Sequence, residues 1–237
     1  MHSEEYEYSD KSLTCKGFVA HDSLTTHRKP CVMIAHAWGG QSDFERNKAK
    51  ELAKLGYVGF ALDNYGNGKT GSSMEENSKL LQPFLDDRAT LLGRLLAGLS
   101  AAEKHPMVDP TKIAIMGFCF GGLCSLDLAR SSDERLKGAI SFHGLFDPPK
   151  LGKQKTITAK VLVLHGYDDP MAKPDSMIGL AKELTDAKAD WQLHAYGGTV
   201  HAFTDPNANM PDNGILYNKA AAHRSWASLI NFLDELF

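Results

Sequence analysis

Short apolar runs recur along the chain, separated by stretches in which apolar residues follow helical spacing. Most of these runs show little alternation between apolar and polar residues, which is typical of strands buried on both faces of a sheet. The runs that we predict to be strands cover 31–35, 57–62, 113–116, 138–142, 161–164 and 191–196.

Helices are predicted between these strands. In the first of them Phe44, Ala49, Leu52 and Ala53 share one helical face, with Asp43 as the expected N-cap and a glycine at position 56 after the C-terminus. The helical segments cover 43–55, 83–104, a stretch after the third strand that ends at 130, 174–188 and 213–237.

Strands that alternate with helices indicate parallel strands joined by right-handed crossovers. We therefore predict one doubly wound α/β domain over 1–237, with a mostly parallel sheet flanked by helices. Residues 1–29 form a polar, turn-rich N-terminal region with one or two short strands, such as 12–19. Residues 63–83 begin with a long Gly-rich polar stretch, which we interpret as a lid or a long connection.

Composition narrows the function. With 26 Lys and Arg against 29 Asp and Glu in 237 residues, the net charge of −3 argues against a nucleic-acid partner. Four cysteines without a C-x-x-C pair predict neither a disulfide scaffold nor a metal site, and no motif requires a cofactor. No apolar run approaches a membrane span, and the acidic N-terminus is unlike a signal peptide. We expect a soluble cytoplasmic protein, whose oligomeric state no pattern indicates.

The third central strand leads into GFCFGG at 117–122, which has the form of a nucleophile elbow with Cys119 as the nucleophile. Glycines on both sides allow the strand and the following helix to approach closely. The N-terminus of that helix favours a thiolate and a nearby oxyanion. The alternative is a glycine-rich turn that contains a buried cysteine.

A carboxylate and a histidine follow two later strands. HGYDDP at 165–170 offers Asp169 as the acid, with Asp168 as the second choice, and His201 follows the last predicted strand. The order Cys119, Asp169, His201 is the chain order of an α/β-hydrolase triad. We predict that His201 is the base for Cys119 and that Asp169 orients its imidazole. Each residue alone has a plainer interpretation, as a loop histidine or a turn aspartate.

The first buried strand ends in HAWGG at 36–40, which is similar to an oxyanion turn. We predict that the backbone N–H groups of Trp38 and Phe120 bind the oxyanion. His36 is expected to orient this turn rather than to carry a proton.

Together these segments resemble the dienelactone hydrolase family of α/β-hydrolases from about residue 29 to the C-terminal helix. The segments that carry the resemblance are IAHAWG at 34–39, DNYG at 63–66, GFCFGG at 117–122, HGYDDP at 165–170 and HAF at 201–203. The resemblance implies a hydrolase of carboxylic esters or lactones that works through a thioester intermediate.

The chain departs from the family's pattern at the positions that would handle charge. Ala37 stands where the pattern has a glutamate near the thiol, and Asp205 lies where an arginine would bind a substrate carboxylate. We therefore expect a neutral ester or lactone, with promiscuity toward aryl esters and phosphotriesters. Aromatic residues near the strand ends are candidates for the substrate pocket, namely Tyr65, Phe118, His143 and Phe203.

Two alternatives stay open from the sequence. One is a dienelactone hydrolase of the carboxymethylenebutenolidase type, acting on an anionic lactone with Lys69 as the carboxylate anchor. The other is a non-catalytic sensor that binds electrophiles at Cys119. A disulfide role is weaker, because Cys124 lies five residues along the predicted helix and is poorly aligned for a bond.

Overall fold

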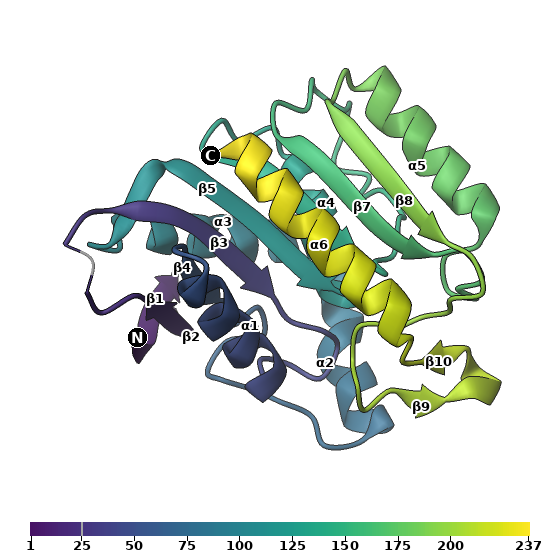
Figure 1. Cartoon of the computed structure of the whole chain (residues 1–237), viewed down its shortest axis with the longest axis horizontal. Coiled ribbons are helices and arrows are strands. Elements are labelled where there is room, and N and C mark those ends of the chain that lie inside the picture. Colours follow the sequence, from purple (N-terminus) through teal and green to yellow (C-terminus); the bar gives the residue numbers. More distant parts are fainter. Residues whose placement is uncertain (25) are drawn as a thin grey trace.

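An eight-stranded sheet forms the centre of the computed structural model, which describes residues 1–24 and 26–237 (Figure 1). The strand order is β1-β2-β4-β3-β5-β6-β7-β8, antiparallel for the first two pairs and parallel from β4 to β8. The strands are β1 His2–Asp10, β2 Leu13–His21, β3 Lys29–Ala35, β4 Val58–Ala61, β5 Val108–Phe118, β6 Leu136–Phe142, β7 Lys160–Gly166 and β8 Trp191–Tyr196. A small antiparallel pair, β9 Asn209–Met210 and β10 Ile215–Leu216, stands apart.

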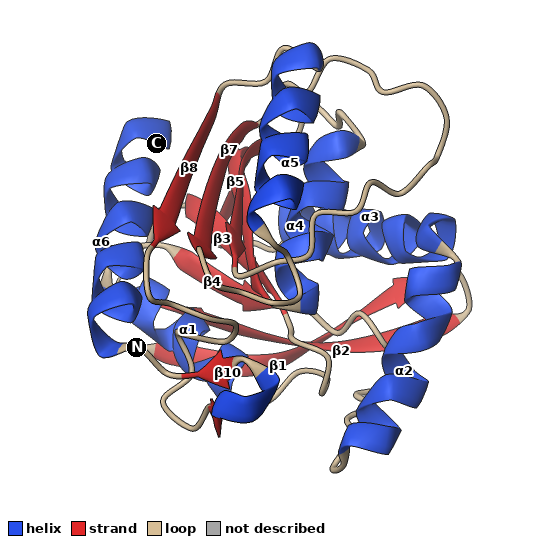
Figure 2. Ribbon diagram, turned by 90° about the vertical axis from the view of Figure 1, so that its right-hand side faces the viewer, coloured by secondary structure: helices blue, strands red, loops and turns tan. Residues whose placement is uncertain are grey.

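Helices cover both faces of the sheet (Figure 2). Apolar residues of α1 and α6 pack on one face, and those of α3, α4 and α5 pack on the other. The helices are α1 Asp43–Lys54, α2 Met74–Asp86, α3 Arg88–Lys104, α4 Phe120–Arg130, α5 Pro174–Asp186 and α6 Lys219–Leu236. The predicted architecture, a doubly wound and mostly parallel sheet flanked by helices, is confirmed.

Burial on both faces explains the uninterrupted apolar runs. In β3, Val32 and Ile34 join the core under α1 and α6, whereas Cys31 and Met33 join the core on the opposite face. Because neither face of the strand meets water, no polar alternation is required.

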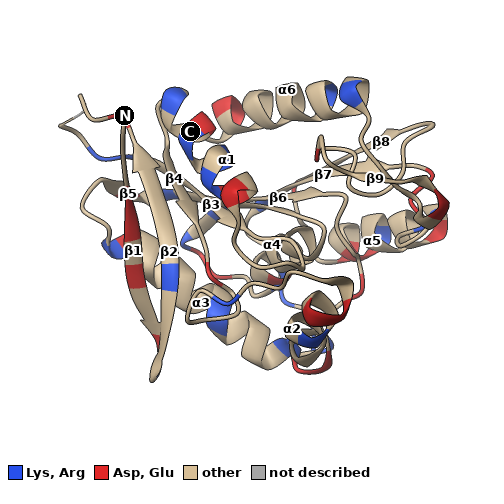
Figure 3. Cartoon of the chain, turned by 90° about the horizontal axis from the view of Figure 1, so that it is seen from below, with Lys and Arg blue, Asp and Glu red and all other residues tan. Residues whose placement is uncertain are grey.

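The N-terminal region holds two strands that are longer than the sequence indicated. β1 and β2 pair over nine residues each, and β1 is the edge of the sheet. Figure 3 shows acidic residues along β1. In the strand register, Glu7 of β1 lies directly opposite Lys16 of β2. Charges on an edge strand discourage pairing with another chain, and they masked the strand pattern in the sequence.

The stretch after β4 is a structured connection. The buried carboxylate of Asp63 accepts hydrogen bonds from the N–H groups of Lys16, Gly66 and Gly68 at 2.7–2.8 Å. Helix α2 begins at Met74, so the predicted loop over 63–83 is wrong for its second half. The role of this segment as a lid remains a prediction.

Two predicted helix boundaries are also wrong. The helix expected over 83–104 is divided at Asp87, whose side chain caps α3 by accepting a hydrogen bond from the N–H of Thr90. The last helix begins at Lys219 rather than 213, because a 3-10 turn over Pro211–Asn213 and β10 precede it. Gly214, at φ 67°, ends that turn.

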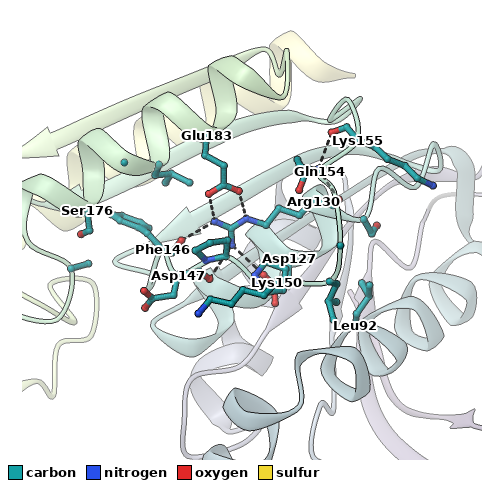
Figure 4. Close-up of a pocket in the computed structure, with 18 of the residues that line it drawn as sticks. Leu92, Asp127, Arg130, Phe146, Asp147, Lys150, Gln154, Lys155, Ser176 and Glu183 are labelled. Atoms are coloured by element: carbon teal, nitrogen blue, oxygen red, sulfur yellow. Dashed lines mark hydrogen bonds and ion pairs between the residues drawn. The ribbon is translucent and has the colours of Figure 1, made fainter.

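A buried ion-pair network connects α3, α4 and α5, the helices on one face of the sheet. Arg88 of α3 makes two hydrogen bonds with Asp127 of α4, at 2.7 and 2.8 Å. Figure 4 shows Arg130 of α4 between Asp127 and Glu183 of α5. Arg130 also donates to the carbonyl of Phe146, which follows β6. The network therefore fixes α4, the helix that starts beside Cys119, against its neighbours.

We expect Asp127→Ala to lower the free energy of unfolding by about 3–5 kcal/mol, because Arg88 and Arg130 would remain buried with fewer partners. Urea denaturation measures the change. As a control, Asp186→Ala removes an exposed ion pair with Lys182 and should cost far less. Equal losses in the two variants would contradict the role assigned to the network.

Candidate active site

Cys119 occupies a strained turn between β5 and α4, with φ 56° and ψ −116°. The turn is possible only because two glycines flank it. A Cβ on Gly117 would lie 2.1 Å from the carbonyl oxygen of Gly121, and a Cβ on Gly121 would lie 2.0 Å from that of Ala35. The strand and helix therefore meet backbone to backbone, and Cys119 is lifted to the carboxyl edge of the sheet, where it is partly exposed.

Asp169 and His201 meet at the same edge. Asp169 follows β7, His201 follows β8, and His201 Nδ1 lies 2.7 Å from Asp169 Oδ2, with both side chains buried. Asp168, the second choice of the sequence analysis, is exposed. Bonds from the N–H of His201 to the carbonyl of Gly214, and from the N–H of Leu216 to the carbonyl of His201, hold the histidine on β10.

The protonated form of His201 is favoured in this setting. Burial alone would lower its pKa, but the hydrogen bond to Asp169 and the nearby Cys119 thiol outweigh burial and raise the pKa of His201 to about 10. Within the residues described, Nε2 of His201 has no fully formed hydrogen bond. This nitrogen is therefore available for proton exchange.

His143 supports the elbow from the next strand. Its Nδ1 accepts a hydrogen bond from the N–H of Cys119 at 3.2 Å, and burial holds the pKa of His143 well below its usual value. The ring is therefore neutral with its proton on Nε2, which donates to Thr204 Oγ1 at 2.8 Å. The His143 ring also packs edge-on against His201 at 5.1 Å between centroids.

The turn after β3 is held by a buried glutamate. Glu45 Oε1 accepts from the N–H of Ala37 at 3.3 Å, and Oε2 accepts from the N–H of Ser42 at 2.8 Å. Ser42, not Asp43, is the N-cap of α1, and Glu45 completes its capping box. The hydroxyl of Tyr65 donates to the carbonyl of Trp38 at 2.8 Å from below.

The backbone N–H groups of Trp38 and Phe120 make no hydrogen bond to another group in the described part of the chain. His36 helps to fix their surroundings, since its Nε2 accepts from the N–H of Asn64 and its Nδ1 donates to the carbonyl of Ala37. Burial lowers the pKa of His36, in keeping with a neutral orienting role.

One pocket contains the thiol and the imidazole. The residues proposed from the sequence that line it are Trp38, Phe118, Cys119, His143 and His201. Tyr65 and Phe203 are buried outside its lining, the first beneath the turn at Trp38 and the second behind His143 at 5.2 Å between rings. Asp205 lines the pocket, whereas Lys69 does not.

Several lining residues escaped the sequence analysis. Phe44 and Glu45 reach the pocket from α1, Met74 from α2, and Thr204 and Met210 from the segment after β8. None of these residues follows a parallel strand directly, which was the criterion that located the others.

Neither a metal cluster nor a membrane-spanning helix is present in the described part of the chain. Over 1–24 and 26–237, no group of three or more His, Cys, Asp or Glu side chains is arranged to hold a metal ion. Within the same ranges, no helix combines the length and apolar character that crossing a membrane requires.

We expect Asp169→Asn to lower the pKa of His201 from about 10, because burial, which lowers this pKa, would be opposed by Cys119 alone and no longer by the carboxylate. An NMR titration of the imidazole nitrogens measures the change. The matched control is Asp168→Asn, which alters an exposed neighbour and should leave the pKa of His201 in place. Equal pKa values in the two variants would contradict the assigned pairing.

Comparisons with known proteins indicate the family to which the chain belongs. A protein of Saccharolobus solfataricus, whose name proposes a carboxymethylenebutenolidase, is 35% identical over 269 residues and covers 98% of each chain. The crystal structure of P91, a dienelactone hydrolase-like promiscuous phosphotriesterase from metagenomic libraries, superposes with a TM-score of 0.92 at 33% identity, covering 100% of this chain and 98% of that one.

A second solved structure, called m3DLH, superposes with a TM-score of 0.94 at 32% identity over 100% of this chain and 98% of that one. The sequence model of the dienelactone hydrolase family matches residues 16–237. The chain therefore belongs to the dienelactone hydrolase family, whose members are hydrolases with the α/β-hydrolase fold.

Proposed function

We propose that this protein hydrolyses uncharged carboxylic esters or lactones, with Cys119 as nucleophile, His201 as acid and base, and Asp169 as the orienting carboxylate. The observation that carries the proposal is the 2.7 Å bond between His201 Nδ1 and Asp169 Oδ2. That bond fixes the orientation of the imidazole. Within the described residues, Nε2 of the same ring has no fully formed hydrogen bond. Cys119 lies near enough to contribute to the raised pKa of His201.

In the first half-reaction the Cys119 thiolate attacks the carbonyl carbon, and the carbonyl electron pair moves to oxygen. The free N–H groups of Trp38 and Phe120 are the donors that would stabilise this oxyanion. Collapse of the intermediate breaks the C–O bond, and the departing oxygen takes the proton from His201 Nε2. A thioester on Cys119 remains.

In the second half-reaction His201, now neutral, takes a proton from water as the water attacks the thioester. The C–S bond breaks, the carboxylic acid leaves, and the thiolate and imidazolium return. Asp169 favours the imidazolium in both halves, since its hydrogen bond raises the pKa of His201. No step needs a metal or an organic cofactor.

A second activity, on phosphotriesters, is favoured by one comparison. P91 is described as a promiscuous phosphotriesterase and shares 33% identity with this chain over its full length. The same thiolate would attack phosphorus and displace an aryloxide, and water, with its proton taken by His201, would then cleave the P–S bond, release the phosphodiester and regenerate the thiolate. We propose this as a side activity, because an uncharged phosphotriester meets the same charge requirement as an uncharged ester.

We expect Cys119→Ala to reduce kcat/KM for p-nitrophenyl acetate by at least about a thousandfold, because the thioester cannot form. Steady-state release of p-nitrophenol measures the effect, and paraoxon turnover should fall in parallel. The control is Cys31→Ala, which removes a buried thiol from the amino-terminal part of β3, where this strand pairs with β4 and β5.

A single equivalent of p-nitrophenol from the wild type, followed by no turnover, would favour the electrophile sensor instead. Comparable rates in the wild type and Cys119→Ala would reject the thiol nucleophile altogether.

Substrate charge distinguishes the neutral from the anionic alternative. We expect kcat/KM for p-nitrophenyl valerate to exceed that for mono-p-nitrophenyl glutarate by about tenfold or more, because Asp205 and Asp43 line the pocket and Lys69 does not. Asp205→Asn should lower the ratio of kcat/KM for the valerate to kcat/KM for the glutarate, because it removes one negative charge from the lining. Faster hydrolysis of the glutarate, lost in Lys69→Ala, would support a hydrolase of anionic lactones.

A further inference from the structure

Three exposed methionines contribute to the lining of one cavity. Met74, Met171 and Met210 are 59%, 47% and 39% exposed, and all three line the pocket that contains Cys119 and His201. They come from the start of α2, the loop after β7 and the end of β9. We call these three side chains the methionine rim. Large apolar side chains that are exposed together, rather than singly, mark a binding surface.

The backbone beneath the rim is fixed, although the side chains are free. The N–H of Met171 donates to Asp169 Oδ1 at 2.8 Å, so this methionine is attached to the carboxylate that orients His201. Met74 begins a helix capped by Ser73, and Met210 pairs with Ile215 in the small sheet. Unbranched methionine side chains on fixed backbone can adapt to apolar groups of different shape.

An apolar wall continues from the rim toward the thiol. Phe44 and Phe118 pack edge to face at 4.9 Å, and Trp38 and Ile215 line the same cavity. The cavity measures about 1160 Å³. This volume is large even for a drug-sized ligand, so the small acyl group of an acetate ester would leave most of it empty.

The charged residues of the cavity favour an uncharged occupant over an anionic one. Asp43, Glu45 and Asp205 line it. Among the lining residues that the structure describes, Arg46 is the one basic residue that is always charged, and it is paired with Glu5 at 2.5 Å. Within the described residues, no lysine contributes to the lining.

We propose that the methionine rim is a subsite for a large apolar acyl group, of about six to eight carbons or an aryl ring, carried by an uncharged ester. The proposal rests on the proposed function, because it assumes that Cys119 attacks the ester bound in this cavity. The rim determines which ester is preferred, while the triad determines that it is cleaved.

The test is a chain-length series of p-nitrophenyl esters, from acetate through butyrate to octanoate, below their solubility limits. Full burial of one methylene is worth about fourfold in affinity. For a partly open subsite we therefore expect wild-type kcat/KM to rise by about tenfold or more from acetate to octanoate. The combined variant Met74→Gln, Met171→Gln and Met210→Gln keeps similar volume and exposure but makes the rim polar.

We expect this variant to lose the gain for octanoate, so that the ratio of its kcat/KM for octanoate to that for acetate falls from about tenfold or more toward one. Ile178→Gln is the matched control, because Ile178 is an exposed apolar residue of α5 outside the cavity. An equal loss for acetate and octanoate, or no loss for either, would overturn the subsite.

Failure of the proposed function gives a different result. In that case no ester would show Cys119-dependent turnover in the wild type. The rim is then tested by equilibrium binding of the non-hydrolysable 4-nitrophenyl octyl ether, followed by competition with a fluorescent apolar probe. Tighter binding to the wild type than to the triple variant supports the subsite, and equal binding rejects it.

Discussion

The backbone contact between β5 and α4 is the constraint on which the site depends. Gly117 and Gly121 leave no room for a Cβ, and their contact turns the chain so sharply that Cys119 adopts a positive φ. Such a conformation costs about 1–3 kcal/mol and persists only where surrounding packing holds it. Every residue of α4 is buried, and Asp127 and Arg130 fasten the helix to α3 and α5. The burial of α4 therefore holds Cys119 in its strained position at the carboxyl edge of the sheet.

The other parts of the site reach this fixed point from separate directions. The loops after β7 and β8 carry Asp169 and His201, and the small sheet holds His201 by its backbone on both sides. In the turn after β3, the side chain of Glu45 accepts a hydrogen bond from the N–H of Ala37 and so supports the neighbouring Trp38. Position 37 itself carries no charged side chain. Hydrogen-bonded segments thus support the site from β3, β7 and β8, while the methionine rim adds unbranched, adaptable side chains to the lining of the cavity.

The positions of the three triad candidates could be predicted from the sequence better than the lining of the cavity. Cys119, Asp169 and His201 each follow a parallel strand, and strand order alone brings such positions to one edge. The start of α2 was missed although Ser73 and Glu76 carry an S-x-x-E capping signal, because the glycines before it suggested a loop. The lining side chains could not be predicted, since their approach depends on how α1, α2 and β9 pack in three dimensions.

The distribution of the four cysteines has a practical consequence. Cys15, Cys31 and Cys124 are buried within the sheet and helices, and Cys119 alone is partly exposed, beside an open cavity. A thiol reagent should therefore react with one cysteine per chain in the native protein and with four after unfolding. The same titration then reports both the concentration of working sites and the integrity of the fold that shields the other three.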